Sequence, residues 1–324
     1  MTPNNKAPAT GSILGRLALY FWFRPKEKLQ RCFSEGGPWQ QHLAQKGHKA
    51  MAQAAKSLPA IPPRNGEPFE LHLLTGARFW DQTAFCLYSL QLHCDRPIRP
   101  FIYDDGTLLP ETCAHLQRIA PQSRFVSIEQ IRKNLDALLP QSKFPYLRDR
   151  WEHYPNIRKL IDPHLGSSGW KLVIDSDLLF FRRPELLLRW SSEPRTPLHA
   201  IDVQTSYGYS NALLSELAQN PLAEKVNVGL CGLNSDELDW NQLEQWCAEL
   251  IEREKTNYYL EQALVAMLVA NRECTIAPAE DYITLPRPPE AQVCQAVMHH
   301  YVAESKRWYF QTNWRQFLRP NESR

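Results

Sequence analysis

Two aspartates, Asp175 and Asp177, are the residues of this chain whose type and spacing point most directly to chemistry. They stand between two apolar runs, residues 172–174 and 178–181, and the first run predicts a strand buried on both faces. Carboxylates beside a hydrophobic core are costly unless a partner neutralises them. A divalent cation fits, because oxygen ligands suit Mn²⁺ or Mg²⁺ and leave coordination positions for substrate phosphates. Taken alone, the pattern favours two acids in a β-turn or at the cap of the next helix over a metal site.

A second candidate group lies near the C-terminal end, where His300 is followed by Lys306 and Trp308. A neutral imidazole binds Mn²⁺ well, and an ammonium group can stabilise the charge of a departing phosphate. Together with the two aspartates, this spacing resembles GT-A fold nucleotide-sugar glycosyltransferases, in particular glycosyltransferase family 8 and its relatives, which close with His-x-x-Gly-x-x-Lys-Pro-Trp. The chain has Ala303 in place of the glycine and Arg307 in place of the proline. We expect these departures to affect the backbone path of the loop more than its metal ligand.

Three further segments resemble the same family, in the same order along the chain. Residues 73–76 correspond to the strand that holds the base and ribose. Asn227-x-Gly229 corresponds to an Asn-x-Gly segment that lines the sugar and acceptor site, and Glu261-Gln262 to an Asp-Gln pair. The resemblance covers residues 69–308, which is most of the chain.

The resemblance implies a metal-dependent transfer of a sugar from a nucleoside-diphosphate sugar, expected to be a UDP-hexose, to an acceptor hydroxyl with retention of configuration. The implied metal ligands are Asp175, Asp177 and His300. The implied donor contacts are Leu74, Thr75, Gly76, Lys159, Asp175, Ser176, Gly229, Lys306 and Trp308. The implied catalytic and sugar-orienting residues are Asn227, Glu261, Gln262 and Lys306. The expected cofactor is Mn²⁺ or Mg²⁺.

The residues leave three alternatives open. An inverting enzyme would use Glu261 or Asp202 as general base. A nucleotidyltransferase would pair a Gly-Ser turn, here Gly166-Ser167, with the two aspartates, but it would not explain the C-terminal histidine and lysine. A non-catalytic protein that binds a sugar nucleotide would have no need to retain all of these groups.

The elements that must position these residues alternate between strands and helices. Predicted strands at 69–74, 98–103 and 125–128 alternate with predicted helices at 81–92 and 110–119. This order predicts an α/β fold with a mainly parallel sheet and helices on both faces, in the GT-A (Rossmann-like) manner. Further predicted elements are helices at 156–161, 184–190, 240–253 and 257–270 and strands at 172–174, 199–202 and 226–234. Ligands of such sheets bind at the carboxyl ends of the strands.

The N-terminal part predicts a separate unit. Residues 1–65 form a helical extension, with a helix at 39–58 and a proline- and glycine-rich linker at 61–66, and residues 66–324 form the GT-A domain. Residues 12–23 are apolar but shorter than the roughly 20 residues that span a bilayer. They predict a helix that either packs on the catalytic domain or lies on a membrane surface.

Composition narrows the class of protein. With 43% hydrophobic and 22% charged residues, the chain is an ordinary globular protein. A net charge of +2 argues against a nucleic-acid partner. The eight cysteines are scattered and form no C-x-x-C pair, which argues against a zinc site and against a dense disulfide framework. Free cysteines favour a cytoplasmic protein. The expected helix at 12–23 could hold that protein at the membrane surface. The acceptor, whether glycan, lipid or protein, is left open.

Overall fold

The computed structural model describes residues 37–62 and 64–318. The strands are β1 (Phe69–Thr75), β2 (Ile98–Asp104), β3 (Arg124–Val126), β4 (Trp170–Ile174), β5 (Leu178–Phe180), β6 (Leu198–Ile201), β7 (Val226–Asn234), β8 (Thr275–Ile276), β9 (Tyr282–Thr284) and β10 (Met298–His300). The α-helices are α3 (Gly37–Ala55), α4 (Trp80–His93), α5 (Pro110–Ile119), α6 (Ile128–Leu138), α7 (Pro145–His153), α8 (Arg158–Ile161), α9 (Glu185–Ser192), α10 (Asn211–Ala218), α11 (Trp240–Glu254), α12 (Leu260–Leu268), α13 (Pro288–Val293) and α14 (Lys306–Gln311). Short 3₁₀ turns include η2 (Pro155–Ile157) and η4 (Ala303–Ser305).

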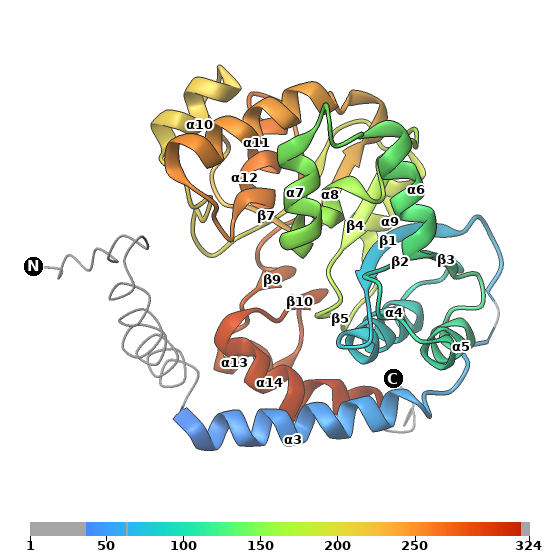
Figure 1. Ribbon diagram of the computed structural model, residues 1–324. Coiled ribbons are helices and arrows are strands. Elements are labelled where there is room, and N and C mark those ends of the chain that lie inside the picture. The colour runs from blue at the N-terminus through green and yellow to red at the C-terminus, as the bar shows by residue number, and fades with distance from the viewer. Residues whose placement is uncertain (1–36, 63, 319–324) are drawn as a thin grey trace, which may run out of the picture.

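A seven-stranded sheet with the order β3-β2-β1-β4-β7-β6-β8 forms the centre of the structure (Figure 1). Strand β7 is antiparallel to both of its neighbours, and all other neighbouring strands are parallel. The prediction of a mainly parallel α/β sheet is therefore confirmed.

Helices cover both faces of this sheet, and each face has its own hydrophobic core. On one face, buried side chains of β1 and β4 pack with those of α4, α5 and α9. On the other face, buried side chains of β7 pack with those of α6, α7, α10, α11 and α12. Strand β7 is buried along nearly its whole length, and its sequence is mostly apolar, with two glycines and with Asn227 and Asn234 near its ends.

A small second sheet, with the order β5-β10-β9, joins the segment after the two aspartates to the C-terminal part of the chain. Strand β10 pairs antiparallel with β5, so that His300 lies opposite Leu178, and the backbone N–H of Tyr301 donates to the carbonyl of Asp177 over 3.0 Å. The strand that follows the acidic pair thus binds the strand that carries the histidine. The sequence analysis did not predict this sheet.

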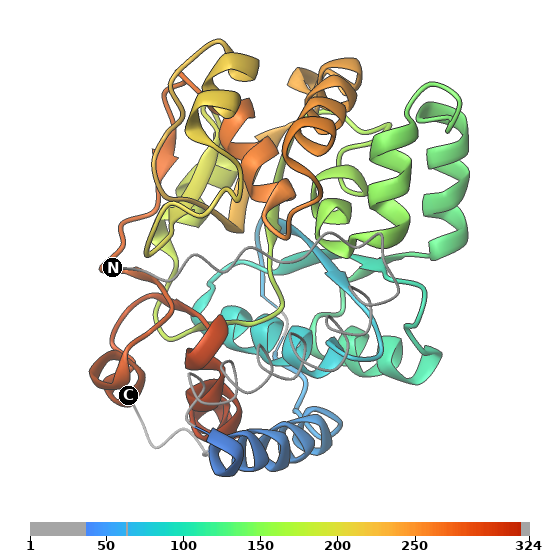
Figure 2. The ribbon, with the colours of Figure 1, turned by 60° about the vertical axis from the view of Figure 1, so that its left-hand side comes forward.

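Helix α3 packs along α14 and against α4, so the first and last described helices lie side by side (Figures 1 and 2). Met51 and Ala55 of α3 are fully buried and belong to the same hydrophobic core as β1. The division of the chain into an extension and a domain at residue 65 stays a prediction.

Three local expectations differ from the structure. The strand expected at 125–128 ends at Val126, because Ser127 instead caps α6 by accepting from the backbone N–H of Gln130. The helix expected at 156–161 is the 3₁₀ turn η2 followed by the single turn α8. Helix α10 was not predicted. In the described part of the chain, no helix is long and apolar enough to cross a membrane. Residues 12–23, with their expected helix, lie outside the described residues.

Candidate active site

A cleft of about 1270 Å³ opens at the carboxyl ends of β1, β2 and β4. Thr75 at the end of β1, Asp105 just after β2 and Asp175 just after β4 all line it. Since β7 runs in the opposite direction, its first residues reach the same edge, and Asn227 and Gly229 also line the cleft. The cleft therefore lies at the edge of the sheet where the sequence predicts the ligand.

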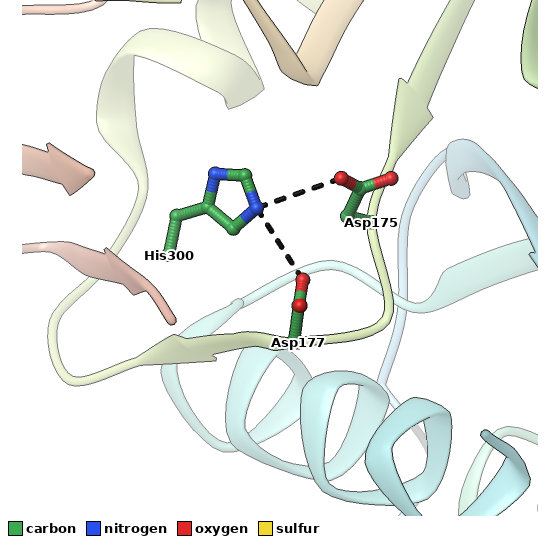
Figure 3. A group of neighbouring side chains, drawn as sticks. All are labelled: Asp175, Asp177 and His300. Atoms are coloured by element: carbon green, nitrogen blue, oxygen red, sulfur yellow. Dashed lines mark ion pairs between the residues drawn. The ribbon is translucent and has the colours of Figure 1, made fainter. Parts of the chain in front are cut away.

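Asp175, Asp177 and His300 form the candidate metal centre (Figure 3). The Nε2 atom of His300 lies 3.3 Å from Oδ1 of Asp177 and 3.5 Å from Oδ2 of Asp175. One ligand atom from each of the three side chains falls within 4.8 Å of the other two. Ligand atoms at right angles around an ion at about 2.1 Å lie about 3 Å apart, so these separations suit one octahedral ion.

The imidazole of His300 is buried, with an exposed fraction of 3%. Its Nε2 atom makes no hydrogen bond of acceptable geometry in the described structure, although it faces both carboxylates. A buried nitrogen aimed between two carboxylate oxygens is a donor set for a divalent cation. The residues present therefore fit the Mn²⁺ or Mg²⁺ that the sequence predicts.

Gly229 provides the space for the His300 imidazole. A Cβ atom at position 229 would lie 2.1 Å from Cε1 of His300 and 2.6 Å from its Nδ1. Asp175 is fixed against the same strand, because its backbone N–H donates to the carbonyl of Gly229 over 2.9 Å. Strand β7 thus holds two of the three candidate ligands in place.

Two lysines neutralise the acids of the metal centre. Lys159 Nζ lies 2.8 Å from Oδ1 of Asp175 and 3.3 Å from Oε2 of Glu261, and Lys306 Nζ lies 3.0 Å from Oδ2 of Asp177. Burial alone would raise the pKa of both aspartates, but the nearby ammonium groups and His300 outweigh it and lower each pKa below its usual value. Both carboxylates are therefore ionised at neutral pH and available to a cation.

The pKa values of His300 and Glu261 are raised, in contrast to those of the two aspartates. Burial lowers the pKa of His300, but the two carboxylates overcome this effect and raise the pKa to about 9. Burial raises the pKa of Glu261 to about 7, and Lys159 only partly offsets the shift. A cation that binds His300 must therefore displace a proton, as is usual for histidine ligands.

Asp202 and two amide side chains form a second polar cluster in the cleft. Oδ2 of Asp202 accepts from Nδ2 of Asn227 over 3.3 Å and from Nε2 of Gln262 over 3.0 Å. Its Oδ1 accepts from the backbone N–H of Val203 over 2.8 Å. Three donors hold this carboxylate in one orientation, so it presents fixed acceptors to a hydroxylated ligand.

The loop between His300 and Lys306 keeps a tight backbone path despite its two sequence departures. Ala303 adopts a φ of +46°, in the left-handed region that glycine favours. Ala303 begins the turn η4, and Lys306 then begins α14 and points its ammonium group at Asp177. The alanine therefore takes a conformation that glycine adopts more readily, at some cost in strain.

Most of the predicted site residues line one cleft. Those that do so are Leu74, Thr75, Lys159, Asp175, Ser176, Asp177, Asn227, Gly229, Glu261, Gln262, His300 and Lys306. Gly76 does not line it, and allows the close approach of the Asp105 carboxylate, which a Cβ at position 76 would meet at 1.9 Å. Trp308 does not line it either, because its ring turns to the hydrophobic core while Lys306, Arg307 and Phe310 face the cleft. A contact of Gly76 or Trp308 with a donor stays a prediction from the sequence.

Sequence reasoning gave too little weight to three groups of cleft residues. Asp202 was considered only as a base, although it anchors two of the predicted amides. Tyr258 and Tyr259 form an exposed pair with ring centroids 5.3 Å apart at the start of α12. Side chains of α3 also line the cleft. The double tyrosine before Glu261 was a visible signal, but nothing in the sequence places α3 beside the cleft.

No protein-family model matches the chain, and no curated protein matches it in sequence. Among solved structures, it is similar to mouse xyloside xylosyltransferase 1, with 13% identity, a TM-score of 0.48, and coverage of 71% of this chain and 97% of that chain. It is similar to the galactosyltransferase LgtC solved with donor and acceptor sugar analogues, with 12% identity and a TM-score of 0.48. That match covers 77% of this chain and 94% of the LgtC chain. It is also similar to the mannosyltransferase Ktr4p of S. cerevisiae, with 10% identity and a TM-score of 0.44. That match covers 69% of this chain and 76% of the Ktr4p chain. All three are glycosyltransferases by description, and at this level of likeness the reaction has to be argued from the side chains.

Proposed function

We propose that the protein is a metal-dependent glycosyltransferase that moves a sugar from a nucleoside-diphosphate sugar to an acceptor hydroxyl. The observation that carries this proposal is the juxtaposition of two sites in one cleft. One is the cation site of Asp175, Asp177 and His300, and the other is the cluster of Asp202, Asn227 and Gln262. The first suits a diphosphate, and the second suits the hydroxyl groups of a sugar.

The bound cation, Mn²⁺ or Mg²⁺, supplies charge neutralisation of the donor diphosphate. Lys306, whose ammonium group is partly exposed beside Asp177, adds a donor for the phosphate oxygen that takes up the electron pair of the breaking anomeric bond. The acceptor oxygen forms the new bond to the anomeric carbon. In a retaining reaction, which the family resemblance implies, the acceptor proton passes to that departing phosphate oxygen.

Lys159 and Glu261, which line the cleft beside Asp175, support this arrangement. Lys159 bridges Asp175 and Glu261 and is almost fully buried, so it holds the two carboxylates at a fixed distance. Arg158, the other basic residue before β4, instead donates to the backbone carbonyls of Asp104 and Asp105. We therefore assign a role at the donor site to Lys159, and to Arg158 only a structural one.

The inverting alternative would need a carboxylate free to take the acceptor proton. Three hydrogen bonds already hold Asp202, which favours orientation of a hydroxyl over general-base catalysis. The anomeric configuration of the product, read by NMR before mutarotation, separates the two stereochemical courses.

A nucleotidyltransferase has less support. Gly166 and Ser167 precede β4, whereas the two aspartates follow it, and five residues of extended strand separate the two ends by roughly 16 Å. The Gly-Ser turn therefore lies at the opposite edge of the sheet from the cation site and cannot share a phosphate with it.

The test is thermal unfolding with a panel of nucleoside diphosphates, with and without Mn²⁺. A diphosphate at about 100 times its dissociation constant adds roughly 2.7 kcal/mol of stability. We expect one diphosphate, UDP on the family resemblance, to stabilise the wild type only with Mn²⁺, and Asp177→Asn to lose that effect. Asp136→Asn, which removes a carboxylate of α6 that pairs with Arg148 and does not line the cleft, is the control, and it should keep the wild-type response to diphosphate and Mn²⁺. Stabilisation that survives in Asp177→Asn would refute the proposed cation site.

The release of nucleoside diphosphate from the donor then separates an enzyme from a non-catalytic binding protein. Steady Mn²⁺-dependent release from a UDP-hexose, absent in Asp177→Asn, is the result expected of a glycosyltransferase. Binding without release under any acceptor or hydrolysis condition would favour the non-catalytic alternative.

We also propose a cytoplasmic location at an anionic membrane surface. The described cysteines are free and mostly buried, as expected for a reducing compartment. The outward face of α3 carries the exposed Trp39 together with Lys46 and Lys49, and α3 contains no acidic residue. Co-sedimentation with vesicles that contain phosphatidylglycerol, but not with phosphatidylcholine vesicles, is expected and should weaken in Trp39→Ala. Equal binding to both kinds of vesicle would refute the proposed attraction between the lysines of α3 and anionic lipid.

A further inference from the structure

Helix α3 lies outside residues 69–308, the stretch covered by the family resemblance, yet it forms one wall of the cleft. Gln45 and His48 are among its cleft-lining side chains. The helix lies close against α14, because a Cβ at Gly47 would come within 2.2 Å of the carbonyl oxygen of Phe310. Its position beside the cleft is therefore set by tight backbone packing.

The sheet order shows on which side of the cation site α3 lies. Strand β4, which leads to the two aspartates, has β1 on one side and β7 on the other. The cluster of Asp202, Asn227 and Gln262 lies on the side of β7 and β6, because Asn227 is in β7 and Asp202 directly follows β6. Helix α4 follows β1, and α3 packs on α4, so α3 borders the β1 side of the site.

Side-chain contacts link α3, through α4, to the end of the cleft formed by β1 and the turn that carries Asp175 and Asp177. Nε2 of His48 lies 3.0 Å from Oδ2 of the buried Asp81, in the first turn of α4. Two residues later in α4, Oγ1 of Thr83 lies 2.8 Å from Oγ1 of Thr75 and 3.0 Å from Oγ of Ser176. His48 is thus only a few side chains from both the end of β1 and the metal-binding turn.

The side chains at this end differ in chemistry from those around Asp202. The imidazole of His48 stacks on the ring of Phe310 with centroids 4.4 Å apart, and both residues line the cleft. Gln45 adds an exposed amide one turn of helix away, and Phe79 adds a second aromatic ring. Flat aromatic groups beside an amide suit a planar heterocycle with hydrogen-bonding edges, whereas a sugar is better matched by the carboxylate and amides across the site.

We propose that α3 recognises the nucleobase of the donor, with Gln45 and His48 as specificity-determining residues. This inference rests on the proposed function, since the diphosphate on the cation and the sugar near Asp202 leave the nucleoside to extend toward β1. The wall contributed by α3 then selects among bases, while the cation site binds the diphosphate that all donors share.

The test compares binding of UDP, GDP, CDP, ADP and inorganic pyrophosphate to the full chain with Mn²⁺ by calorimetry. Gln45→Ala and His48→Ala are compared with Gln53→Ala, which removes another exposed glutamine of α3 that does not line the cleft. We expect Gln45→Ala and His48→Ala to reduce the ratio of affinities between the best and the second-best nucleotide by about tenfold. Pyrophosphate affinity should stay unchanged in all variants, and Gln53→Ala should keep the wild-type ratio.

Each other outcome has a distinct meaning. An unchanged ratio in both cleft-facing variants overturns the inference and leaves the glycosyltransferase proposal intact. An equal loss for nucleotides and pyrophosphate also overturns it, because α3 would then act on the diphosphate. Failure of wild type to bind any of the five ligands overturns the proposed function together with this inference. Gln45→Ala keeps the test decisive if His48→Ala, which leaves Asp81 without its ion pair, does not fold.

Discussion

The substitution Gly229→Ala tests the candidate metal centre without touching any of its ligands. No unusual φ is required at position 229, so the backbone accepts alanine, and the conflict is purely steric. The added Cβ would lie 2.1 Å from Cε1 of His300, whereas ordinary contact begins at 3.4 Å. The imidazole must therefore move by at least 1.3 Å, the difference between these two distances.

Such a displacement removes His300 as a ligand, because metal–ligand distances tolerate only about 0.2 Å. Loss of an outer-shell partner typically weakens metal binding by about 10–100-fold, so loss of a ligand should cost at least about 100-fold, or about 2.7 kcal/mol. The assay is a Mn²⁺ titration followed by the electron paramagnetic resonance signal of the free ion. Wild-type Mn²⁺ affinity in Gly229→Ala would show that His300 does not bind the ion.

Gly232→Ala is the matched control on the same strand. A Cβ at position 232 would meet the ring of Trp190 at 2.5 Å, on the opposite face of β7 and away from the cleft. This variant should lose about 1–3 kcal/mol of stability from overpacking, with unchanged Mn²⁺ affinity. If both variants lost Mn²⁺ binding equally, the effect would come from general damage to β7.

Three further predictions concern the closing loop, the donor site and acid stability. Because φ of Ala303 is +46°, Ala303→Gly should leave the free energy of unfolding in urea unchanged or raise it by up to about 1 kcal/mol. Ala303→Val should lower it by about 2 kcal/mol. A valine variant more stable than the glycine variant would refute backbone strain at this position. Lys306→Met should lower kcat by about 100-fold while Mn²⁺ still binds; full activity would exclude Lys306 from leaving-group stabilisation. Burial lowers the pKa of His72 and of His164 to about 3, so below pH 6.5 the unfolded chain takes up protons that the folded chain does not. Between pH 7.5 and pH 5.5 each histidine should therefore cost about 1.4 kcal/mol of unfolding free energy, and His164→Asn should abolish its share; an unchanged slope would contradict this assignment.

Local sequence signals predicted most of the central sheet. The apolar runs of β1, β2 and β4 and the intervening helices alternate clearly, and each strand ends at a polar turn that the structure places in the cleft. The acidic pair after β4 could be found for the same reason, since a buried strand followed at once by two carboxylates is an uncommon local pattern. The meeting of His300 with these acids could be proposed only through the family resemblance.

The physical reason is that pairing between distant strands leaves no local signal. Strands β5 and β10 are three residues each, and neither alternates in a way that identifies the other as its partner. The packing of α3 on α14 is hidden in the same way, because Gly47 reads locally as a weak point in a helix and not as a contact site. Trp308 shows a related limit, because its spacing matched the motif but did not predict that its side chain would pack against the core.

The pairing of β5 with β10 also has a consequence for the synthesis of the protein. His300 lies 125 residues after Asp175, so at about 5–20 residues per second the ribosome adds it roughly 6–25 s later. Lys159, in contrast, precedes Asp175 by only 16 residues and can neutralise it as soon as β4 forms. Asp177, in contrast, gains its lysine, Lys306, only after β10 has been made. The candidate cation site of the described residues therefore acquires both its third ligand and its second lysine late, when β10 pairs with β5 and α14 follows.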